Sequence, residues 1–295
     1  MQVLGLDVGG TTIKSGLVDS LGNLTDLRRT PTPQDTSGEK LVAALSELVS
    51  SYKESAQDLS AVGLCVPGIV DSEKGIAVWS GTLGWRDLPL ASLLSKESGL
   101  PVKLVHDVTA GGIAEQAIGA AKGLDSAVVI AIGTGLAASI ILDGKIYRPH
   151  SAVGELGHVP TRNNRPCVCG KSGCLEMTCS GGALSRNYEA LTGNQLAAHE
   201  VIERAEAGES EAKELWDEFL SELGFACHYI AGLLGPEAIV IAGGFGYLGN
   251  RIVDPLNKYL DQVITIQKRP QIITSSLEGT SGCIGAGLSA IASFA

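Results

Sequence analysis

Apolar residues gather along this chain in short runs, and three of these runs end at a turn rich in glycine. The pattern is typical of buried strands that stop at a tight turn. The three are Leu4–Val8 before Gly9-Gly10-Thr11-Thr12, Val128–Ile132 before Gly133-Thr134-Gly135, and Ala238–Ala242 before Gly243-Gly244. The chain is therefore expected to be built from segments that each begin with a strand.

The first two turns continue in the same way, which indicates a diverged internal repeat. The chain resumes as a strand over Ile13–Asp19 in one case and Ser139–Asp143 in the other, and each strand enters a second turn with glycine. Two such hairpins facing each other would form a phosphate clamp, because turn amides and Thr hydroxyls donate to anions. For any one turn taken alone, an ordinary hairpin remains the alternative.

Helical periodicity fills the spaces between these strands. It predicts helices over 38–55, 110–122, 200–234 with a break at 207–209, and 283–295. Strand–helix alternation in both halves predicts an α/β protein of two lobes with mixed sheets. We expect one lobe over residues 1–110 and another over 111–282, with the last helix, 283–295, packing back on the first lobe.

Charge and composition exclude several classes of function. The 295 residues include 22 basic and 32 acidic ones, a net charge of −10, which opposes binding to nucleic acid or anionic membranes. The uncharged run Ser126–Leu142 has glycines at its middle, so two strands explain it better than a membrane helix. Met1 leads straight into Gln2–Asp7 without the basic region and the cleavage site of a signal peptide, so we expect a cytoplasmic protein.

A cluster of cysteines predicts a metal site. Three cysteines fall within eight residues, with a histidine nine residues before them: His158, Cys167, Cys169 and Cys174. Four such ligands fill the tetrahedron of a structural Zn²⁺ site, and three unrelated buried thiols are the alternative. Cys65, Cys179, Cys227 and Cys283 stand in apolar surroundings and are expected in the core.

Four motifs, in this order along nearly the whole chain, resemble the ROK family of sugar kinases and repressors. They are Asp7–Lys14 (DVGGTTIK), Gly133-Thr134-Gly135, Gly154–His158 (GELGH), and Cys167–Glu176 (CVCGKSGCLE). The resemblance implies an actin-like, ribonuclease-H-like ATPase fold with a cleft between two lobes. It also implies transfer of the γ-phosphate of ATP to a sugar hydroxyl, usually the 6-OH of a hexose, with Mg²⁺ and a structural Zn²⁺.

Carried over by position, the resemblance implies a role for each matching residue. Asp107 would be the general base, although an Asp after a strand is also a common helix N-cap. The implied sugar contacts are Gly68, Thr82, His106, Asp107, Glu155, His158 and Glu176. The implied ATP and Mg²⁺ contacts are Asp7, Gly9, Gly10, Thr11, Thr12, Lys14, Gly133, Thr134, Gly135, Gly243 and Gly244. His158, Cys167, Cys169 and Cys174 would bind zinc.

Three departures from the family pattern bear on this reading. His106 stands where an Asn usually precedes the Asp, and Gly81-Thr82-Leu83 stands where Pro-Asn-Leu is usual. Both concern the sugar, so we expect a kinase for glucose or a glucose-configured sugar. An amino sugar (glucosamine, kanosamine or an N-acetylated hexosamine), mannose or fructose is the alternative. Leu136–Ser139 replaces a glycine-rich run and would narrow the second phosphate turn.

Two other functional classes compete with a kinase. One is a sugar-sensing repressor of the same family, which would carry a helix-turn-helix ahead of the first glycine motif. Here Asp7 stands almost at the start of the sequence and the chain is acidic, so DNA binding is not expected. The other is a sugar-binding protein without kinase activity, which the retained Asp107 opposes. Polyphosphate is an alternative to ATP as the phosphoryl donor. The expected assembly is a homodimer.

Overall fold

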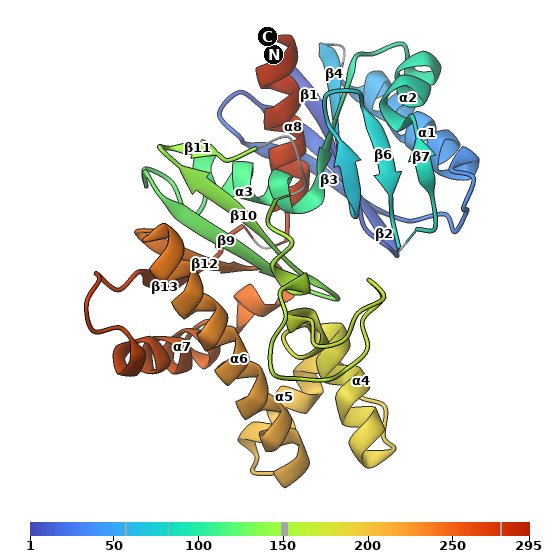
Figure 1. Ribbon diagram of the computed structural model, residues 1–295. Helices are drawn as coiled ribbons and strands as arrows, with labels where there is room; N and C mark the ends of the chain where they lie inside the picture. Colours follow the sequence, from blue (N-terminus) through green and yellow to red (C-terminus); the bar gives the residue numbers. More distant parts are fainter. Residues whose placement is uncertain (57, 82, 149–152, 278) are drawn as a thin grey trace. The chain divides into compact units, whose positions relative to one another are not determined.

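The computed structural model describes residues 1–56, 58–81, 83–148, 153–277 and 279–295. The chain divides into two compact units. Unit 1 comprises Met1–Lys122 with Leu277–Ala295, and unit 2 comprises Gly123–Ser276. Each unit combines a five-stranded mixed sheet with helices (Figure 1), so the expected α/β class is confirmed.

The sheet of unit 1 brings three strand ends to one edge. Its strand order is β3-β2-β1-β4-β8, in which β1, β4 and β8 are parallel and β2 and β3 are antiparallel to their neighbours. The strands are β1 (Gln2–Val8), β2 (Thr12–Asp19), β3 (Leu24–Pro31), β4 (Leu59–Val66) and β8 (Val102–His106). Because parallel strands end at the same edge, the residues after β1, β4 and β8 lie along one rim of the sheet.

Both faces of this sheet are covered, which explains why its central strands are apolar without alternation. On one face, Leu4, Leu6 and Val8 pack with α1 (Glu39–Ser55) and α2 (Leu90–Ser98). On the other face lie α3 (Asp107–Ala117) and α8 (Ser281–Phe294), and α8 runs along β1 in Figure 1. A smaller sheet of β5 (Ile69–Asp71), β6 (Ile76–Trp79) and β7 (Arg86–Leu88) completes the unit.

The expected lobe boundary at 110/111 falls inside α3, because that helix begins at Asp107 and packs tightly on α8. A Cβ added at Gly285 of α8 would lie 1.7 Å from the carbonyl oxygen of Ala110. This contact holds α3 in unit 1, which therefore continues to Lys122. The helix expected over 110–122 accordingly starts earlier and ends earlier than its apolar pattern indicated.

The sheet of unit 2 repeats the order and strand directions of the first sheet. Its order is β11-β10-β9-β12-β13, with β9, β12 and β13 parallel. The strands are β9 (Ala127–Ile132), β10 (Leu136–Leu142), β11 (Lys145–Ile146), β12 (Ala238–Ala242) and β13 (Gln271–Thr274). The internal repeat expected from the first two glycine turns is thus present as a duplicated strand arrangement.

In the described part of unit 2, four α-helices and three short 3-10 helices lie beside this sheet. The α-helices are α4 (Gly181–Thr192), α5 (Ala198–Glu206), α6 (Ser210–Leu234) and α7 (Asn250–Val263), and the 3-10 helices are η1 (Leu156–His158), η2 (Leu175–Met177) and η3 (Gly243–Leu248). The break expected at 207–209 separates α5 from α6. Helices α4 and α7 were not predicted.

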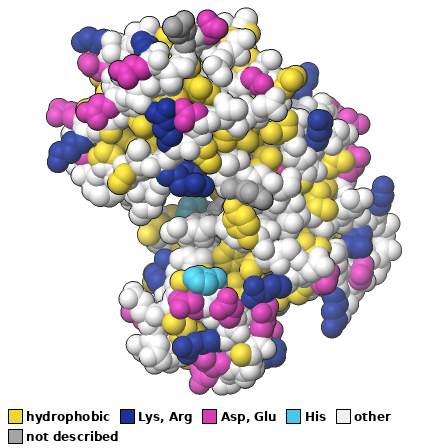
Figure 2. Space-filling model, turned by 180° about the vertical axis from the view of Figure 1, so that it is seen from behind, with side chains coloured by type: hydrophobic (Ala, Val, Ile, Leu, Met, Phe, Trp, Pro, Cys, Tyr) yellow, Lys and Arg dark blue, Asp and Glu magenta, His cyan; other side chains and the backbone are white. Residues whose placement is uncertain are grey.

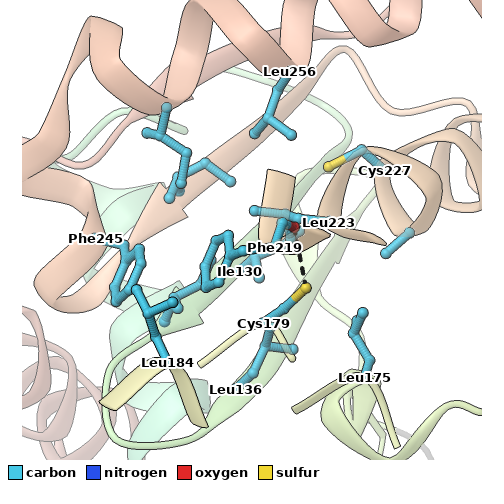
Figure 3. Close-up of a cluster of buried hydrophobic side chains, with 14 of the residues drawn as sticks. Ile130, Leu136, Leu175, Cys179, Leu184, Phe219, Leu223, Cys227, Phe245 and Leu256 are labelled. Carbon is cyan, nitrogen blue, oxygen red and sulfur yellow. Dashed lines mark hydrogen bonds between the residues drawn. The ribbon is translucent and has the colours of Figure 1, made fainter. Parts of the chain in front are cut away.

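The core of unit 2 is centred on Phe219 of α6 (Figure 3). Its ring stacks on Phe245 at 4.9 Å between centroids, and Ile130 of β9 lies beside it. The thiol of Cys179 donates to the carbonyl of Phe219 at 3.3 Å. Cys65, Cys179, Cys227 and Cys283 are all buried, as expected, and burial raises the pKa of each thiol.

The surface carries charges of both signs. On the face in Figure 2, Lys and Arg side chains are interspersed with Asp and Glu, and no basic patch covers that face. Among the described residues, no helix combines the length and apolar character that a bilayer crossing requires.

Candidate active site

The turn after β1 presents backbone amides at the rim of the first sheet. The Gly9 amide closes the turn onto the carbonyl of Thr12 at 3.0 Å, and the Thr32 hydroxyl donates to the Gly9 carbonyl at 2.7 Å. Within the described part of the chain, the amides of Gly10 and Thr11 have no hydrogen-bond partner. Two adjacent amides in a glycine turn can donate to a phosphate oxygen.

Asp7 lies at the end of β1 with its carboxylate held from several sides. Lys14 Nζ lies 3.6 Å from Asp7 Oδ2, and the Cys65 thiol lies 3.5 Å from Oδ1. A Cβ at Gly282 would lie 2.5 Å from the Asp7 Cγ atom, so only glycine leaves room for this carboxylate. Burial raises the pKa of Asp7, and Lys14 opposes that shift. Mg²⁺ prefers carboxylate oxygens, so Asp7 is a residue that could hold this ion.

Asp107 follows β8 at the same rim and is the first residue of α3. Its Oδ1 atom accepts the Val108 amide at 2.7 Å and lies 3.1 Å from Nε2 of His106. The Asp107 side chain is 35% exposed, so a ligand hydroxyl can reach it. His106, the departure from the family pattern, therefore contacts the expected base directly.

The position expected to shape the sugar loop in unit 1 requires glycine. Gly68 has φ 104°, and a Cβ there would lie 2.1 Å from the carbonyl oxygen of Trp79. Gly68 thus lets the segment after β4 pass close to the end of β6. Thr82, the other residue expected in this loop, lies outside the described residues.

The turn after β9 has the same construction as the turn after β1. The Gly133 amide donates to the carbonyl of Gly135 at 3.0 Å, which closes the turn. The first two amides of α4 bind the carbonyl groups of this turn. Gly181 donates to the Gly133 carbonyl at 2.7 Å, and Gly182 donates to the Thr134 carbonyl at 3.3 Å. The amides of Thr134 and Gly135 have no partner in the described parts of unit 2.

A cavity of about 430 Å³ opens beside this second turn. It is lined by Gly133, Thr134, Gly181, Gly182, Ser185, Ala197, Ala198, His199, Ile202, Gly244, Phe245 and Leu248. Gly243, which precedes it, has φ 72°, and a Cβ there would lie 2.5 Å from the carbonyl oxygen of Ile132. A mostly apolar cavity next to free turn amides can take a nucleoside with its phosphates.

Sequence reasoning missed most of this cavity. It found Gly133, Thr134 and Gly244 but not Gly181, Gly182 or the residues at the start of α5. The available signal was Ser180-Gly181-Gly182 ahead of a helical run. Ser180 is the N-cap of α4 and accepts the Ala183 amide at 3.1 Å, which is a common helix start.

Glu155 and Glu176 are both half-buried residues of unit 2, but their surroundings differ. Glu176 Oε2 accepts the Leu136 amide at 2.8 Å, directly after the second turn. No side-chain hydrogen bond of Glu155 occurs among the described residues. Glu155 follows Gly154, which has φ 88° and leaves no room for a Cβ, since one would lie 1.8 Å from the Ala138 carbonyl oxygen.

The four residues expected to bind metal converge. One ligand atom from each of His158, Cys167, Cys169 and Cys174 can be chosen so that all four lie within 4.8 Å of one another. His158 Nδ1 lies 3.6 Å from the Cys167 sulfur, and the sulfurs of Cys169 and Cys174 are 3.5 Å apart. One imidazole and three thiols at these separations suit a tetrahedral Zn²⁺ ion.

An ion pair ties the metal loop to the long helix of unit 2. Arg165 binds both carboxylate oxygens of Glu218 in α6, at 2.7 and 2.8 Å. It also donates to the Thr178 hydroxyl at 3.0 Å. This two-point contact fixes the loop beside η2, the element that carries Glu176.

Comparison with known proteins agrees with the motifs. A sequence model of the ROK family matches residues 3–292. A glucokinase of Halalkalibacterium halodurans is 30% identical over 96% of this chain and 93% of its own length. A ROK family glucokinase from Streptomyces griseus, solved with glucose and AMPPNP, is 27% identical with a TM-score of 0.87 over 99% of this chain and 100% of its own. These similarities confirm the actin-like, ribonuclease-H-like two-lobe fold.

Other relatives differ in function. An N-acetyl-D-glucosamine kinase of Vibrio atlanticus is 28% identical over 96% of this chain and 97% of its own length. A xylose repressor of Bacillus subtilis is 28% identical, but the match takes 81% of this chain and 63% of the repressor. Kinases of two sugars and a regulator are thus similar in sequence to this chain.

Proposed function

Since this chain belongs to the ROK family and is an ATP-dependent sugar kinase, we propose that it phosphorylates the 6-OH of a glucose-configured hexose. The observation that carries the proposal is the rim of the first sheet, where Asp107 and the Gly9–Thr12 turn follow parallel strands. One rim thus offers both a carboxylate that can accept a proton and free amides that can hold phosphate. The glucokinase relatives support glucose as the acceptor.

Asp107 is the general base of the proposed reaction. It takes the proton of the sugar hydroxyl while that oxygen bonds to the γ-phosphorus, and the bond from phosphorus to the bridging oxygen breaks to release ADP. Such transfers need positioning and charge neutralisation more than a strong base. One accessible carboxylate within hydrogen-bond reach of the hydroxyl therefore suffices.

The glycine turn of each unit is a phosphate-binding element in this proposal, and the nucleoside of ATP would lie in the cavity of unit 2. The free amides of Gly10, Thr11, Thr134 and Gly135 are the donors. Asp7 would hold Mg²⁺, and the ion, when bound, neutralises charge on the β- and γ-phosphates. Lys14 donates to the carbonyl of Gly279 at 2.8 Å, which keeps it beside Asp7.

Zinc has a structural role in this proposal. Its four ligands would be His158, Cys167, Cys169 and Cys174, which would leave no position for a reacting water. A bound ion would fix the loop from His158 to Cys174, and Glu176 lies two residues after that loop. Glu155, His158 and Glu176 would contact the sugar hydroxyls. The seven cysteines form no disulfide with one another, which fits the proposal of a reducing, cytoplasmic setting.

An amino sugar is the second candidate substrate. The carboxylate of Asp107 in unit 1, and those of Glu155 and Glu176 in unit 2, would each favour a sugar ammonium over a neutral hydroxyl. His106 contacts Asp107 at 3.1 Å, where the family usually has an Asn amide. Imidazole offers one donor and one acceptor on opposite ring edges, so its contacts with a sugar differ from those of an amide.

Release of ADP, measured over a panel of hexoses and amino sugars, tests the proposed function. We expect turnover with glucose or a glucose-configured amino sugar, and His106→Asn should raise the kcat/KM ratio for glucose over glucosamine by about tenfold. The same assay with polyphosphate as donor tests the donor. If no sugar in the panel releases ADP, the proposal is wrong. Unchanged kcat/KM ratios in His106→Asn would contradict the argument on sugar specificity but not the proposed kinase activity.

We also propose a homodimer, and analytical sedimentation of the purified chain tests it.

A further inference from the structure

The segment Glu176–Gly182 contacts the second glycine turn at three points. Glu176 Oε2 accepts the Leu136 amide at 2.8 Å, and the amides of Gly181 and Gly182 donate to carbonyls of the turn. The two sides of the turn are therefore held by one short stretch of chain. This stretch begins two residues after Cys174, a member of the metal cluster.

The carboxylate of Glu176 fits against the turn closely enough to exclude any other residue at Gly135. A Cβ at Gly135 would lie 2.6 Å from Glu176 Oε2 and 3.4 Å from its Cδ atom. Gly157 lies on the other side, where a Cβ would be 2.3 Å from the Leu136 carbonyl oxygen and 3.2 Å from Glu176 Cβ. Glycines on two loops thus let the carboxylate reach the backbone just past the turn.

The backbone of Glu176 is linked to the start of α4 as well. The Ser180 hydroxyl donates to the Glu176 carbonyl at 2.9 Å and accepts the Ala183 amide at 3.1 Å. Movement of Glu176 would therefore disturb the cap of α4, whose first amides hold Gly133 and Thr134. Side chain and backbone of one residue act on the same turn.

We propose that Glu176 positions the Gly133–Gly135 turn for the phosphates of the nucleotide, in addition to any contact with sugar. The inference rests on the proposed function. Oε2 is committed to the Leu136 amide, which leaves Oε1 for a sugar hydroxyl. Since one carboxylate joins both ligands, sugar and nucleotide should each tighten the binding of the other, by the reciprocity of linkage.

Calorimetric titration of the full chain with Mg²⁺-ADP, in the absence of sugar, separates this role from sugar binding. Glu176→Ala should weaken ADP binding about tenfold, because the Leu136 amide loses its charged acceptor. Glu176→Gln keeps an acceptor oxygen and should stay within about threefold of the wild type. Glu222→Ala is the matched control: it removes a half-buried carboxylate of the same unit that lies in α6 and has no role in the proposed site, and ADP affinity should not change.

Gly135→Ala gives an independent variant. Its methyl group would displace the Glu176 carboxylate without removing the charge, so ADP affinity should fall and the KM for sugar should rise together. Zinc content and circular dichroism verify that each variant folds. Wild-type ADP affinity in folded Glu176→Ala or in folded Gly135→Ala would overturn the inference. A wild-type chain that binds no ADP would instead overturn the proposed function.

Discussion

At the scale of single residues, the proposed chemistry depends on the Asp107 carboxylate. Asp107→Asn keeps the shape of the side chain and its contact with the Val108 amide, but it cannot accept the sugar proton. We expect kcat to fall by roughly 10²–10⁴-fold. ADP affinity should stay unchanged, because the nucleotide contacts belong to other residues. Steady-state kinetics and calorimetry test this, and a variant that keeps a tenth of the wild-type kcat would contradict the assignment.

The buried carboxylate of Asp7 is expected to lower the free energy of unfolding at neutral pH, although the proposed function needs this residue. Burial raises the pKa of its carboxyl, so the folded protein holds the proton more tightly than the unfolded chain does. The stability gained from this proton is complete at acidic pH, below the ordinary pKa near 3.8, and is lost as pH rises through the folded-state pKa. At pH 7 the buried charge is therefore unfavourable.

Asp7→Asn should consequently be more stable than the wild type at pH 7 and less active. Its advantage in melting temperature should shrink as pH falls towards 4, because the wild-type carboxyl then becomes neutral too. Lys14→Met, which removes the neighbouring ammonium and leaves Asp7 in place, is the control and should lower stability at pH 7. Thermal melts from pH 4 to 7 measure both. Equal melting temperatures for Asp7→Asn and the wild type at pH 7 would contradict the prediction.

Only some of the contacts between site residues were predictable from the sequence. Spacing alone placed His158 and the three cysteines together, because all four belong to one loop. The hydrogen bond from the Leu136 amide to Glu176 joins residues 40 positions apart and depends on the absence of a side chain at Gly135. No local sequence pattern predicts such a contact. His106 and Asp107 are adjacent in the sequence, so their proximity was expected. The contact between His106 Nε2 and Asp107 Oδ1 is seen only in the structure.

At the scale of secondary-structure elements, close packing of α8 on the first sheet sets the stability of unit 1. Two glycines of the sheet remove the side chains that would separate α8 from it, and one glycine of α8 does the same towards α3. A Cβ at Gly5 would lie 2.1 Å from the Cys283 carbonyl oxygen, and a Cβ at Gly63 would lie 1.9 Å from that of Ala286. Gly285 makes the matching approach to α3. These distances leave no space for even one methyl group.

Gly63→Ala should therefore destabilise the protein by about 1–3 kcal/mol, since the helix must shift away from β4. Gly232→Ala is the matched control. Gly232 lies inside α6 with nothing within 4 Å of its added Cβ. The same change there should stabilise by about 0.5–1 kcal/mol, because alanine favours the helix more than glycine does. Urea denaturation compares the two, and a neutral Gly63→Ala would show that α8 packs loosely.

Elements with a strong local signal were predicted well. The strands before the three glycine turns, and the break between α5 and α6, follow from apolar runs and from Gly208. Helix α7 was missed because Pro255 lies within it, and α4 because it opens with two glycines. In both cases the local sequence disfavours a helix that tertiary packing holds in place.

At the scale of the whole molecule, metal and activity should be lost together. Cys169→Ser removes one ligand of the cluster, so the chain should lose zinc and most of its kcat while circular dichroism shows most of the fold retained. Metal analysis of the purified chain should give one zinc per chain. Cys227→Ser, a change at a buried thiol away from the cluster, is the control and should keep its zinc. Active enzyme with far less than stoichiometric zinc would contradict a structural metal.

The placement of α8 has a consequence for synthesis on the ribosome. Unit 2 is contiguous, so its last strand and helices are translated before residues 281–294. Unit 1 begins first but cannot close its sheet until α8 arrives, which leaves the apolar face formed by Val3, Gly5 and Ala61 uncovered throughout that interval. Nascent chains stalled before residue 277 should therefore present this face to chaperones, and folded chains that include α8 should not.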